Sequence, residues 1–312
     1  MNYEEMLLSP GISWDAMTAG ITIPSKLYKY QSFIKADGKV NPHWIENMEG
    51  QFHMSLGCEF EDINDCRPYF NKQLTLDYID EFLRSFNADC KTRTEISNKL
   101  THTLTNEFFA SVISNYQRKI RIGCFTDFSD NEQMWTKYAW TKTGYCIEYD
   151  TSKNKLFQLS TLPVLYRTQP YDCSLTFANS LILEANRQGK NRTFEENSEI
   201  FELIYEKILK TAYIPLFIKQ KGRWDFEREY RMFLLPHRNT RDGMLELSQY
   251  LDNNYNLDLA NAISSIYLGE NFAELDNSDE LFEKIISTCR AKRLKLFRKT
   301  TKNSKVENLE IL

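Results

Sequence analysis

The sequence lacks the features that mark several protein classes. Its 312 residues contain 11 glycines and eight prolines, with no glycine-, proline- or serine-rich linker and no internal repeat, so we expect one continuous domain. Its seven cysteines are scattered, odd in number and never spaced as C-x-x-C, which fits reduced thiols better than a disulfide framework or a zinc site. With four histidines in the whole chain, we expect no metal.

The chain also lacks long apolar runs and an excess of one charge sign. No uninterrupted apolar stretch approaches the roughly 18–20 residues that span a bilayer. The first 20 residues carry Glu4 and Glu5 but no basic residue, unlike a signal peptide. Thirty-nine Lys and Arg against 43 Asp and Glu leave a net charge of −4, which provides no general field for a nucleic-acid backbone. We therefore expect a cytoplasmic protein without a membrane partner.

Familiar catalytic signatures are missing as well, whereas aromatic residues are abundant. The sequence contains no P-loop, G-x-G-x-x-G, G-x-S-x-G, H-E-x-x-H or kinase motif. Twenty Phe, 17 Tyr and five Trp make up 13% of the chain, which is more ring surface than a minimal core needs. Any function must therefore be sought in the aromatic and charged clusters.

The apolar pattern predicts strands on both sides of a helical insertion. Residues 1–25 are expected to form an irregular lead-in, 26–300 the core and 301–312 a tail. Short alternating runs predict strands, and apolar residues at three-to-four-residue spacing predict helices. The expected strands are 27–30, 51–56, 121–125, 145–149, 162–166, 229–235, 265–268 and 294–297, and the expected helices lie within 74–116, 131–140, 194–212 and 279–290. This is an α+β fold with a mixed sheet core, a helical insertion and a C-terminal strand–helix–strand unit.

The first cluster of interest is the strand Leu27–Ser32. In a strand, alternate residues share a face, so Tyr28, Tyr30 and Ser32 face one way and Lys29 the other. A ring beside a hydroxyl could form the floor of a site for a planar heterocycle. The alternative is a hydrophobic strand with a solvated lysine.

The second cluster covers residues 123–149. Trp135 and Tyr138 are three residues apart, so on a helix they share a face and either wall a pocket or fill the core. Glu148 lies among apolar strand residues, where an unpaired charge is costly. We therefore expect Glu148 to have a partner or a pocket.

The third and densest cluster is K-Q-K-G-R-W-D-F-E-R-E-Y-R, residues 219–231. If the chain is extended from Phe226 onward, Glu227, Glu229 and Arg231 lie on one face. Two neighbouring carboxylates repel each other and raise the pKa of at least one, which suits acid–base or cation-stabilising chemistry, and Arg231 could offset the repulsion. The alternative is a ladder of alternating charges on an exposed edge strand.

Together these motifs resemble the bacterial domain-of-unknown-function family 2971. Its opening Tyr-[His/Lys]-Tyr-x-Ser strand corresponds to residues 28–32, and its Ser and Asn-Asp segments to Ser55 and Asn64-Asp65. The Cys-Phe-Ser/Thr, Met-Trp-x-x-Tyr, Gly-x-x-Ile-Glu and Trp-x-x-Glu-x-Glu-[Tyr/Trp]-Arg motifs correspond to residues 124–126, 134–138, 144–148 and 224–231. The same order of motifs is similar to the ADP-ribosyltransferase fold.

The resemblance implies that NAD is the substrate and binds in a cleft between strands. It implies that Tyr30 stacks near the nicotinamide and that Glu229 bonds the ribose and stabilises its developing positive charge. Glu227 would position or deprotonate the acceptor. Lys29 stands where relatives carry His, and could hydrogen-bond a ribose hydroxyl or a pyrophosphate oxygen. The NAD-binding residues are expected to be Lys29, Tyr30, Ser32, Ser55, Asn64, Asp65, Trp135, Tyr138 and Arg231.

By the same resemblance, the chain is an effector that transfers ADP-ribose to a macromolecular acceptor, a protein or a nucleic acid. It would act in anti-phage defence or as a toxin, with an antitoxin or another defence-system component as a further partner. One alternative is an NAD glycohydrolase, in which water is the acceptor. Another is a catalytically silent module that recognises a nucleotide or a phage protein. A third is a nuclease whose carboxylates gather around Mg²⁺, namely Asp62, Asp65, Glu148, Glu227 and Glu229.

Overall fold

The computed structural model describes residues 2–9, 14–35, 37–188, 211–233, 238–240, 243–245, 252, 256–300 and 305–309. The chain divides into two compact units, where the sequence predicted one continuous domain. Unit 1 comprises residues 1–17, 56–120 and 165–221, and unit 2 comprises 18–55, 121–164 and 222–312. The boundaries fall inside or directly beside strands and helices, so no linker-like composition marks them.

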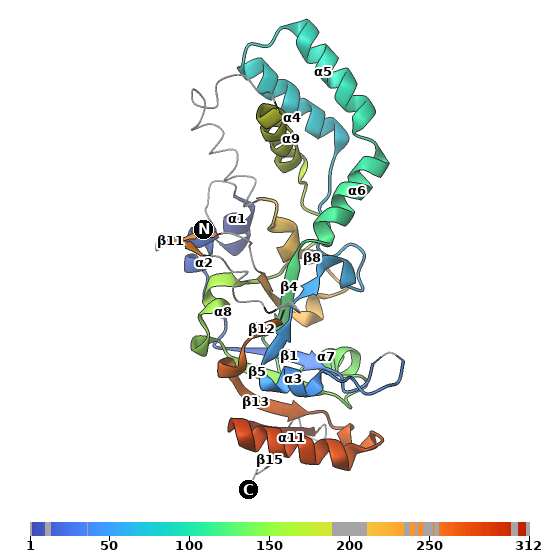
Figure 1. The fold of residues 1–312 in the computed structure, drawn as a ribbon, viewed down its shortest axis with the longest axis vertical. Coiled ribbons are helices and arrows are strands. Elements are labelled where there is room, and N and C mark those ends of the chain that lie inside the picture. The colour runs from blue at the N-terminus through green and yellow to red at the C-terminus, as the bar shows by residue number, and fades with distance from the viewer. Residues whose placement is uncertain are drawn as a thin grey trace. The chain divides into compact units, whose positions relative to one another are not determined.

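Unit 2 is built on a mixed, mostly antiparallel sheet, drawn in Figure 1. Strand β1 (Lys26–Gln31) pairs with β5 (Tyr145–Asp150), and β5 pairs with β13 (Ile263–Leu268), both antiparallel. β13 then pairs in parallel with β14 (Lys295–Thr300), and α11 (Ser278–Lys292) connects these two strands. This confirms the predicted α+β class and the C-terminal strand–helix–strand unit.

On the other side of β1, the sheet continues through β4 (Arg121–Thr126), β9 (Glu229–Phe233) and β6 (Thr161–Pro163), all antiparallel. Within the described residues, β1 pairs with β5 along its whole length but with β4 at the single position Tyr28–Thr126. The sheet therefore divides at β1. In Figure 1, β4 lies at a steep angle to β1 and β5.

The shorter elements of unit 2 complete its layers. β2 (Gln51–His53) pairs with β12 (Asn256–Asp258), and β10 (Arg238–Thr240) pairs with β11 (Gly243–Leu245). The helices are α3 (Trp44–Glu49), α7 (Glu132–Tyr138) and α8 (Lys155–Ser160). Two elements bridge the sequence boundaries of the units, namely α2 (Trp14–Gly20) and β3 (Ser55–Leu56).

Unit 1 contains the predicted helical insertion. The expected helical region 74–116 forms α4 (Lys72–Ser85), α5 (Cys90–Thr103) and α6 (Asn106–Gln117). The side chains of Asn71, Asp89 and Thr105 cap these helices by accepting hydrogen bonds from free backbone N–H groups. Helix α9 (Ser174–Gln188) packs on α4, and β7 (Leu165–Arg167) pairs in parallel with β8 (Ile218–Gln220). Most of the helix expected at 194–212 lies outside the described residues.

Both ends of the chain differ from the sequence prediction. The prediction of an irregular lead-in is wrong, because residues 1–25 include α1 (Tyr3–Leu8) and α2. Helix α1 starts with a capping box, in which Asn2 accepts from the Glu5 N–H and Glu5 accepts from the Asn2 N–H, both at 2.9 Å. The prediction of a tail outside the core is also wrong, because residues 305–309 form β15. This strand pairs with β14 and covers its free edge.

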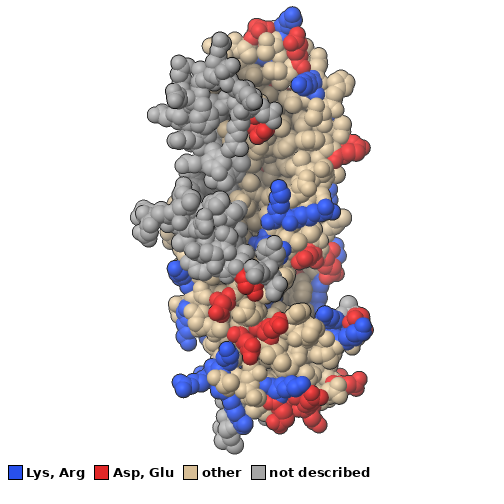
Figure 2. Space-filling model, in the orientation of Figure 1, with Lys and Arg blue, Asp and Glu red and all other residues tan. Residues whose placement is uncertain are grey.

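The surface carries charges of both signs. Lys and Arg side chains are interspersed with Asp and Glu on the face drawn in Figure 2, in keeping with the net charge of −4. None of the helices in the described ranges combines the length and the apolar character that a bilayer crossing requires.

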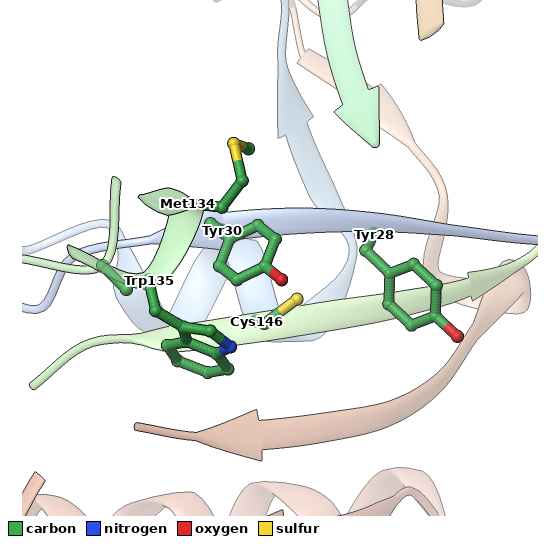
Figure 3. Packing of buried hydrophobic residues seen from close by; sticks show 6 residues of the cluster. Tyr28, Tyr30, Met134, Trp135 and Cys146 are labelled. Carbon is green, nitrogen blue, oxygen red and sulfur yellow. The ribbon is translucent and has the colours of Figure 1, made fainter. Parts of the chain in front are cut away.

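The aromatic residues of unit 2 pack on both faces of the sheet. On one face, Phe125 and Tyr149 pack against each other and against Phe157 of α8, and Phe52 stacks on Phe125. On the opposite face, α7 covers β1 and β5 with a cluster that contains Tyr28, Tyr30, Met134, Trp135, Ala139 and Cys146, most of which Figure 3 labels. A large part of the aromatic excess is therefore core.

One glycine has no room for a side chain where β5 begins. A Cβ atom at Gly144 would lie 2.2 Å from the Gln31 carbonyl oxygen and 2.9 Å from the Ala139 Cα, both of them backbone atoms. We expect Gly144→Ala to lower the free energy of unfolding by about 3 kcal/mol, because the backbone of β1 or α7 must move. Urea denaturation of purified protein measures the change.

The matched control is Gly38→Ala in the same unit. Gly38 has a φ of 79° and no atom within 4 Å of its Cβ position, so its replacement adds about 1 kcal/mol of backbone strain and no clash. If both variants lower the free energy of unfolding by the same amount, the close packing around Gly144 does not contribute to the stability of unit 2.

Candidate active site on the sheet of unit 2

A row of polar side chains crosses five strands of the unit 2 sheet. Ser265 pairs with Glu148, Glu148 with Tyr28, Tyr28 with Thr126, and Thr126 with Glu229. Because directly paired residues point to the same side of a sheet, these five side chains share one face. Tyr28 and Tyr30 lie on this face and Lys29 on the other, as the alternation of the sequence predicted.

Glu229 and Arg231 form a buried ion pair on this face. The Arg231 Nε donates to the Glu229 Oε1 at 2.8 Å, and its Nη2 donates to the Oε2 at 3.0 Å. The Arg231 residue is 0% exposed and Glu229 is 5% exposed. β9 lies between β4 and β6, so the alternative of a charge ladder on an exposed edge strand is wrong. The bidentate geometry fixes the plane of the carboxylate.

Glu227 reaches the same cluster by a different route from the one predicted. The strand begins at Glu229, and residues Asp225–Glu227 form a 3₁₀ turn. The prediction of an extended chain from Phe226 is therefore wrong. Arg228 adopts a left-handed conformation with a φ of 42°, and its guanidinium bonds the Asp127 carboxylate at 2.5 Å. This turn reverses the chain locally and buries Glu227 as well as Glu229.

Tyr138 joins the two carboxylates to the surface of unit 2. Its hydroxyl donates to the Glu227 Oε1, and the residue remains 36% exposed. Burial of the phenol, followed by the charge and hydrogen bond of Glu227 and the charge of Glu229, holds the pKa of Tyr138 well above its ordinary value. The phenol therefore stays protonated at neutral pH and donates a hydrogen bond to Glu227.

Cys124 also belongs to this cluster. Burial raises the pKa of its thiol above the usual range, and the negative charge of Glu229 raises it further, against the opposing charges of Arg231 and Lys29. A neutral thiol is a poor nucleophile. Cys124 therefore contributes a small, uncharged side chain beside Glu229.

Glu148, which was expected to have a partner or a pocket, is surrounded by donors. Its Oε1 accepts from the Ser264 hydroxyl at 2.6 Å and lies 2.9 Å from the Lys26 ammonium. Its Oε2 accepts from the Tyr267 and Tyr28 hydroxyls at 2.8 and 3.2 Å. Burial alone would raise the pKa of this carboxyl, but these hydrogen bonds and the Lys26 charge outweigh it, so the pKa lies below its ordinary value.

Two of the predicted NAD contacts are core residues. Trp135 is 1% exposed, and its indole N–H donates to the Ser129 carbonyl at 3.0 Å. Tyr30 packs edge-to-face on Trp135 with ring centroids 5.0 Å apart, and its hydroxyl donates to the Phe128 carbonyl at 2.9 Å. In Figure 3 both rings lie within the cluster between α7 and the sheet. Neither ring offers a free face to a ligand, so the core interpretation of Trp135 applies.

The other predicted contacts of the first strand lie apart from the carboxylates. The Lys29 ammonium lies 5.4 Å from the centre of the Phe52 ring, on the opposite face of the sheet. The Ser32 hydroxyl donates to the Ile34 carbonyl at 2.7 Å and accepts from the Ile34 N–H, so it shapes a local turn. Ser55 starts the short strand β3.

Asn64 and Asp65 belong to unit 1, although the family motif groups them with residues of unit 2. Asp65 is 2% exposed and lies 3.3 Å from the Lys219 ammonium, itself buried. Among the predicted site residues, the structure thus brings together Glu227, Glu229, Arg231 and Tyr138. Sequence reasoning missed Tyr267 and Ser264 as partners of Glu148, because the run Ile-Ser-Ser-Ile-Tyr-Leu at 263–268 indicates a strand but not which residues it faces.

The five carboxylates of the nuclease alternative are divided between the units. Asp62 and Asp65 lie in unit 1, and Glu148, Glu227 and Glu229 lie in unit 2. In the part of the chain that the structure describes, no group of three or more His, Cys, Asp or Glu residues is arranged to hold a metal ion.

Comparison of the chain with protein-family models, with curated proteins and with solved structures finds no match. The function must therefore be argued from the geometry of the chain itself.

The Glu148 cluster predicts a specific dependence of stability on pH. Because the folded-state pKa of Glu148 is lowered, its stabilising contribution is complete above the unfolded value and is lost as the pH falls through the folded value. We expect Glu148→Gln to lower the free energy of unfolding by about 1–3 kcal/mol at pH 7. Below about pH 5 the free energy of unfolding of this variant should fall less steeply with pH than that of the unaltered protein. Urea denaturation at a series of pH values measures both effects.

The control for this series is Glu283→Gln, at an exposed position on α11. Its unfolding free energy should follow that of the unaltered protein at each pH. If the free energies of unfolding of Glu148→Gln and of the unaltered protein fall in parallel as the pH is lowered, the pKa of Glu148 is not lowered in the folded state.

Proposed function

We propose that this chain cleaves the nicotinamide–ribose bond of NAD and transfers ADP-ribose to a macromolecular acceptor. The observation that carries the proposal is the buried Glu229 carboxylate, oriented by the bidentate Arg231, beside a second carboxylate, Glu227, that holds a tyrosine hydroxyl. This is a fixed negative charge in a water-poor environment, which is what a developing ribosyl cation requires. The motif resemblance points to the same chemistry.

The proposed reaction uses the two carboxylates differently. The C–N glycosidic bond breaks, nicotinamide leaves as a neutral molecule with the bonding electron pair, and positive charge develops at the ribose carbon. Glu229 stabilises that charge, because Arg231 fixes its plane before the substrate binds. A nucleophile of the acceptor then forms a bond to the same carbon and transfers its proton to Glu227.

Tyr138 marks the entrance to this site. It is the most exposed member of the cluster, and its hydroxyl bonds Glu227 directly. A substrate that reaches the carboxylates would meet the Tyr138 ring first, and the ring offers a surface for a planar nicotinamide. In this proposal Tyr138 takes the stacking role that the family resemblance implied for Tyr30.

The biological setting follows from the resemblance alone. An enzyme of this kind would be an effector of anti-phage defence or a toxin, with an antitoxin or another defence component as its partner. The acceptor would be a protein or a nucleic acid. If water serves as the acceptor instead, the same two carboxylates perform NAD hydrolysis.

A second candidate function is a silent module that binds a nucleotide or a phage protein without turnover. The observations that favour it are the burial of Tyr30 and Trp135 in the core and the close engagement of Glu229 by Arg231. In a silent module this ion pair would have a purely structural role. Catalytic measurement distinguishes the two functions.

We expect the purified chain to release nicotinamide from NAD and to label an acceptor in a cell lysate when the NAD carries a label on its adenylate part. Glu229→Gln should lower both rates by about a hundredfold or more, because it removes the charge that stabilises the cation. Nicotinamide release is followed by chromatography and labelling by gel. Glu227→Gln should reduce labelling more than nicotinamide release.

The control is again Glu283→Gln, which removes an exposed carboxylate of the same unit and should retain full activity. Circular dichroism of each variant confirms that the fold is kept. Nicotinamide release without labelling identifies a glycohydrolase. Absence of both products from the unaltered chain, or equal activity of Glu229→Gln, contradicts the proposed catalysis and favours the silent module.

A further inference from the structure

The described part of unit 1 contains a cavity of about 550 Å³, which is within the range of small-molecule sites. Four segments distant in sequence form it: the loop that contains Asn64 and Tyr69, the first part of α6, the end of β7 with the loop that follows it, and β8 with Pro215 before it. The catalytic proposal for unit 2 uses none of these residues.

The walls of the cavity are aromatic. Phe70 and Phe109 stack with ring centroids 5.4 Å apart, and Tyr69 and Tyr171 add two further rings. Burial, together with the charges of Cys173 and Asp172, raises the pKa of Tyr171 to about 12, so its hydroxyl is protonated at neutral pH. Rings arranged around a space of this size suit a planar ligand.

The charges that line the cavity are all positive. Arg67, Arg167 and Lys219 line it, and none of the described lining residues is acidic. Lys219 forms an ion pair with Asp65 at 3.3 Å, and Arg167 forms one with Glu4 at 3.4 Å. Neither carboxylate lines the cavity. Arginine binds phosphate with a fork of donors, so this composition favours an anion.

Hydrogen bonds hold the loops of the cavity in place. The Cys173 N–H donates to the Tyr69 carbonyl at 2.8 Å, and the Asn71 N–H donates to the Ser174 hydroxyl at 2.7 Å. The Lys221 N–H donates to the Arg167 carbonyl at 3.0 Å. The site is therefore largely preformed, which reduces the entropy lost when a ligand binds.

We propose that this cavity binds a free mononucleotide, with the base between the aromatic walls and the phosphate at the arginines. The amide side chains of Asn64, Asn106 and Gln169 also line it and could donate to and accept from the edge of the base. The chain would thus carry a nucleotide site in unit 1 that is separate from the carboxylate cluster in unit 2. This inference does not rest on the proposed catalysis.

The test is calorimetric titration of the full chain with AMP, with adenosine and with inorganic phosphate. AMP should bind at one site and more tightly than either of the other two, because it alone uses both the rings and the cations. Arg67→Ala and Tyr69→Ala, both at exposed positions, should each weaken AMP binding by about tenfold. Arg84→Ala, which removes an exposed cation of the same unit outside the cavity, should leave binding unchanged.

Glu229→Gln separates this proposal from the catalytic one. It should bind AMP like the unaltered chain whether or not it cleaves NAD. The proposal is overturned if AMP does not bind, if phosphate alone binds as tightly as AMP, or if the two cavity variants behave like Arg84→Ala. It is also overturned if Glu229→Gln abolishes AMP binding while Arg67→Ala retains it.

Discussion

The buried ion pair between Glu229 and Arg231 is the interaction on which the architecture of unit 2 depends most. Removing two charges from water costs several kcal/mol for each ion, and good geometry is needed to offset that cost. Here two hydrogen bonds of 2.8 and 3.0 Å join the guanidinium and the carboxylate. A shift of β9 by one residue would turn both charges to the opposite, apolar face of the sheet, so the pair fixes the register of this strand.

That register determines where the rest of the candidate site lies. It places Glu229 opposite Thr126 on β4, and Thr126 lies opposite Tyr28 at the point where the sheet divides. The left-handed residue Arg228 precedes the strand and turns Glu227 into the same cluster. At the other end of the row, Glu148 gathers hydroxyls from β1 and β13. Glu229 and Glu148 therefore stand on one face with different partners: Glu229 accepts from the Arg231 guanidinium, and Glu148 accepts mainly from hydroxyl groups.

Local sequence patterns predicted much of this fold. Period-two alternation identified β1, β4, β5 and β9, and helical spacing identified α4, α6, α7 and α11. The start of the chain was missed, because Pro10 and Gly11 outweighed the capping box of Asn2 and Glu5. Arg228 was missed because a left-handed conformation is rare for a residue with a side chain.

The site was predicted less completely, because the role of a residue depends on partners far along the chain. Glu148 was expected to need a partner, but Tyr267 is 119 residues away and no local pattern connects them. Tyr30 and Trp135 have the composition of a binding surface, yet they pack against each other. Asn64 and Asp65 stand within the order of motifs, yet they fold into unit 1. Order along the chain does not report proximity in space.

The most direct test of this account is a double-mutant cycle on the ion pair, with Glu229→Gln, Arg231→Met and both together, followed by urea denaturation. Arg231→Met alone should cost about 3–5 kcal/mol, because Glu229 loses its bidentate partner in a buried position. The double variant should be less destabilised than the sum of the single variants by more than about 1.5 kcal/mol. If the two changes add to within about 0.5 kcal/mol, the pair does not organise the sheet as described.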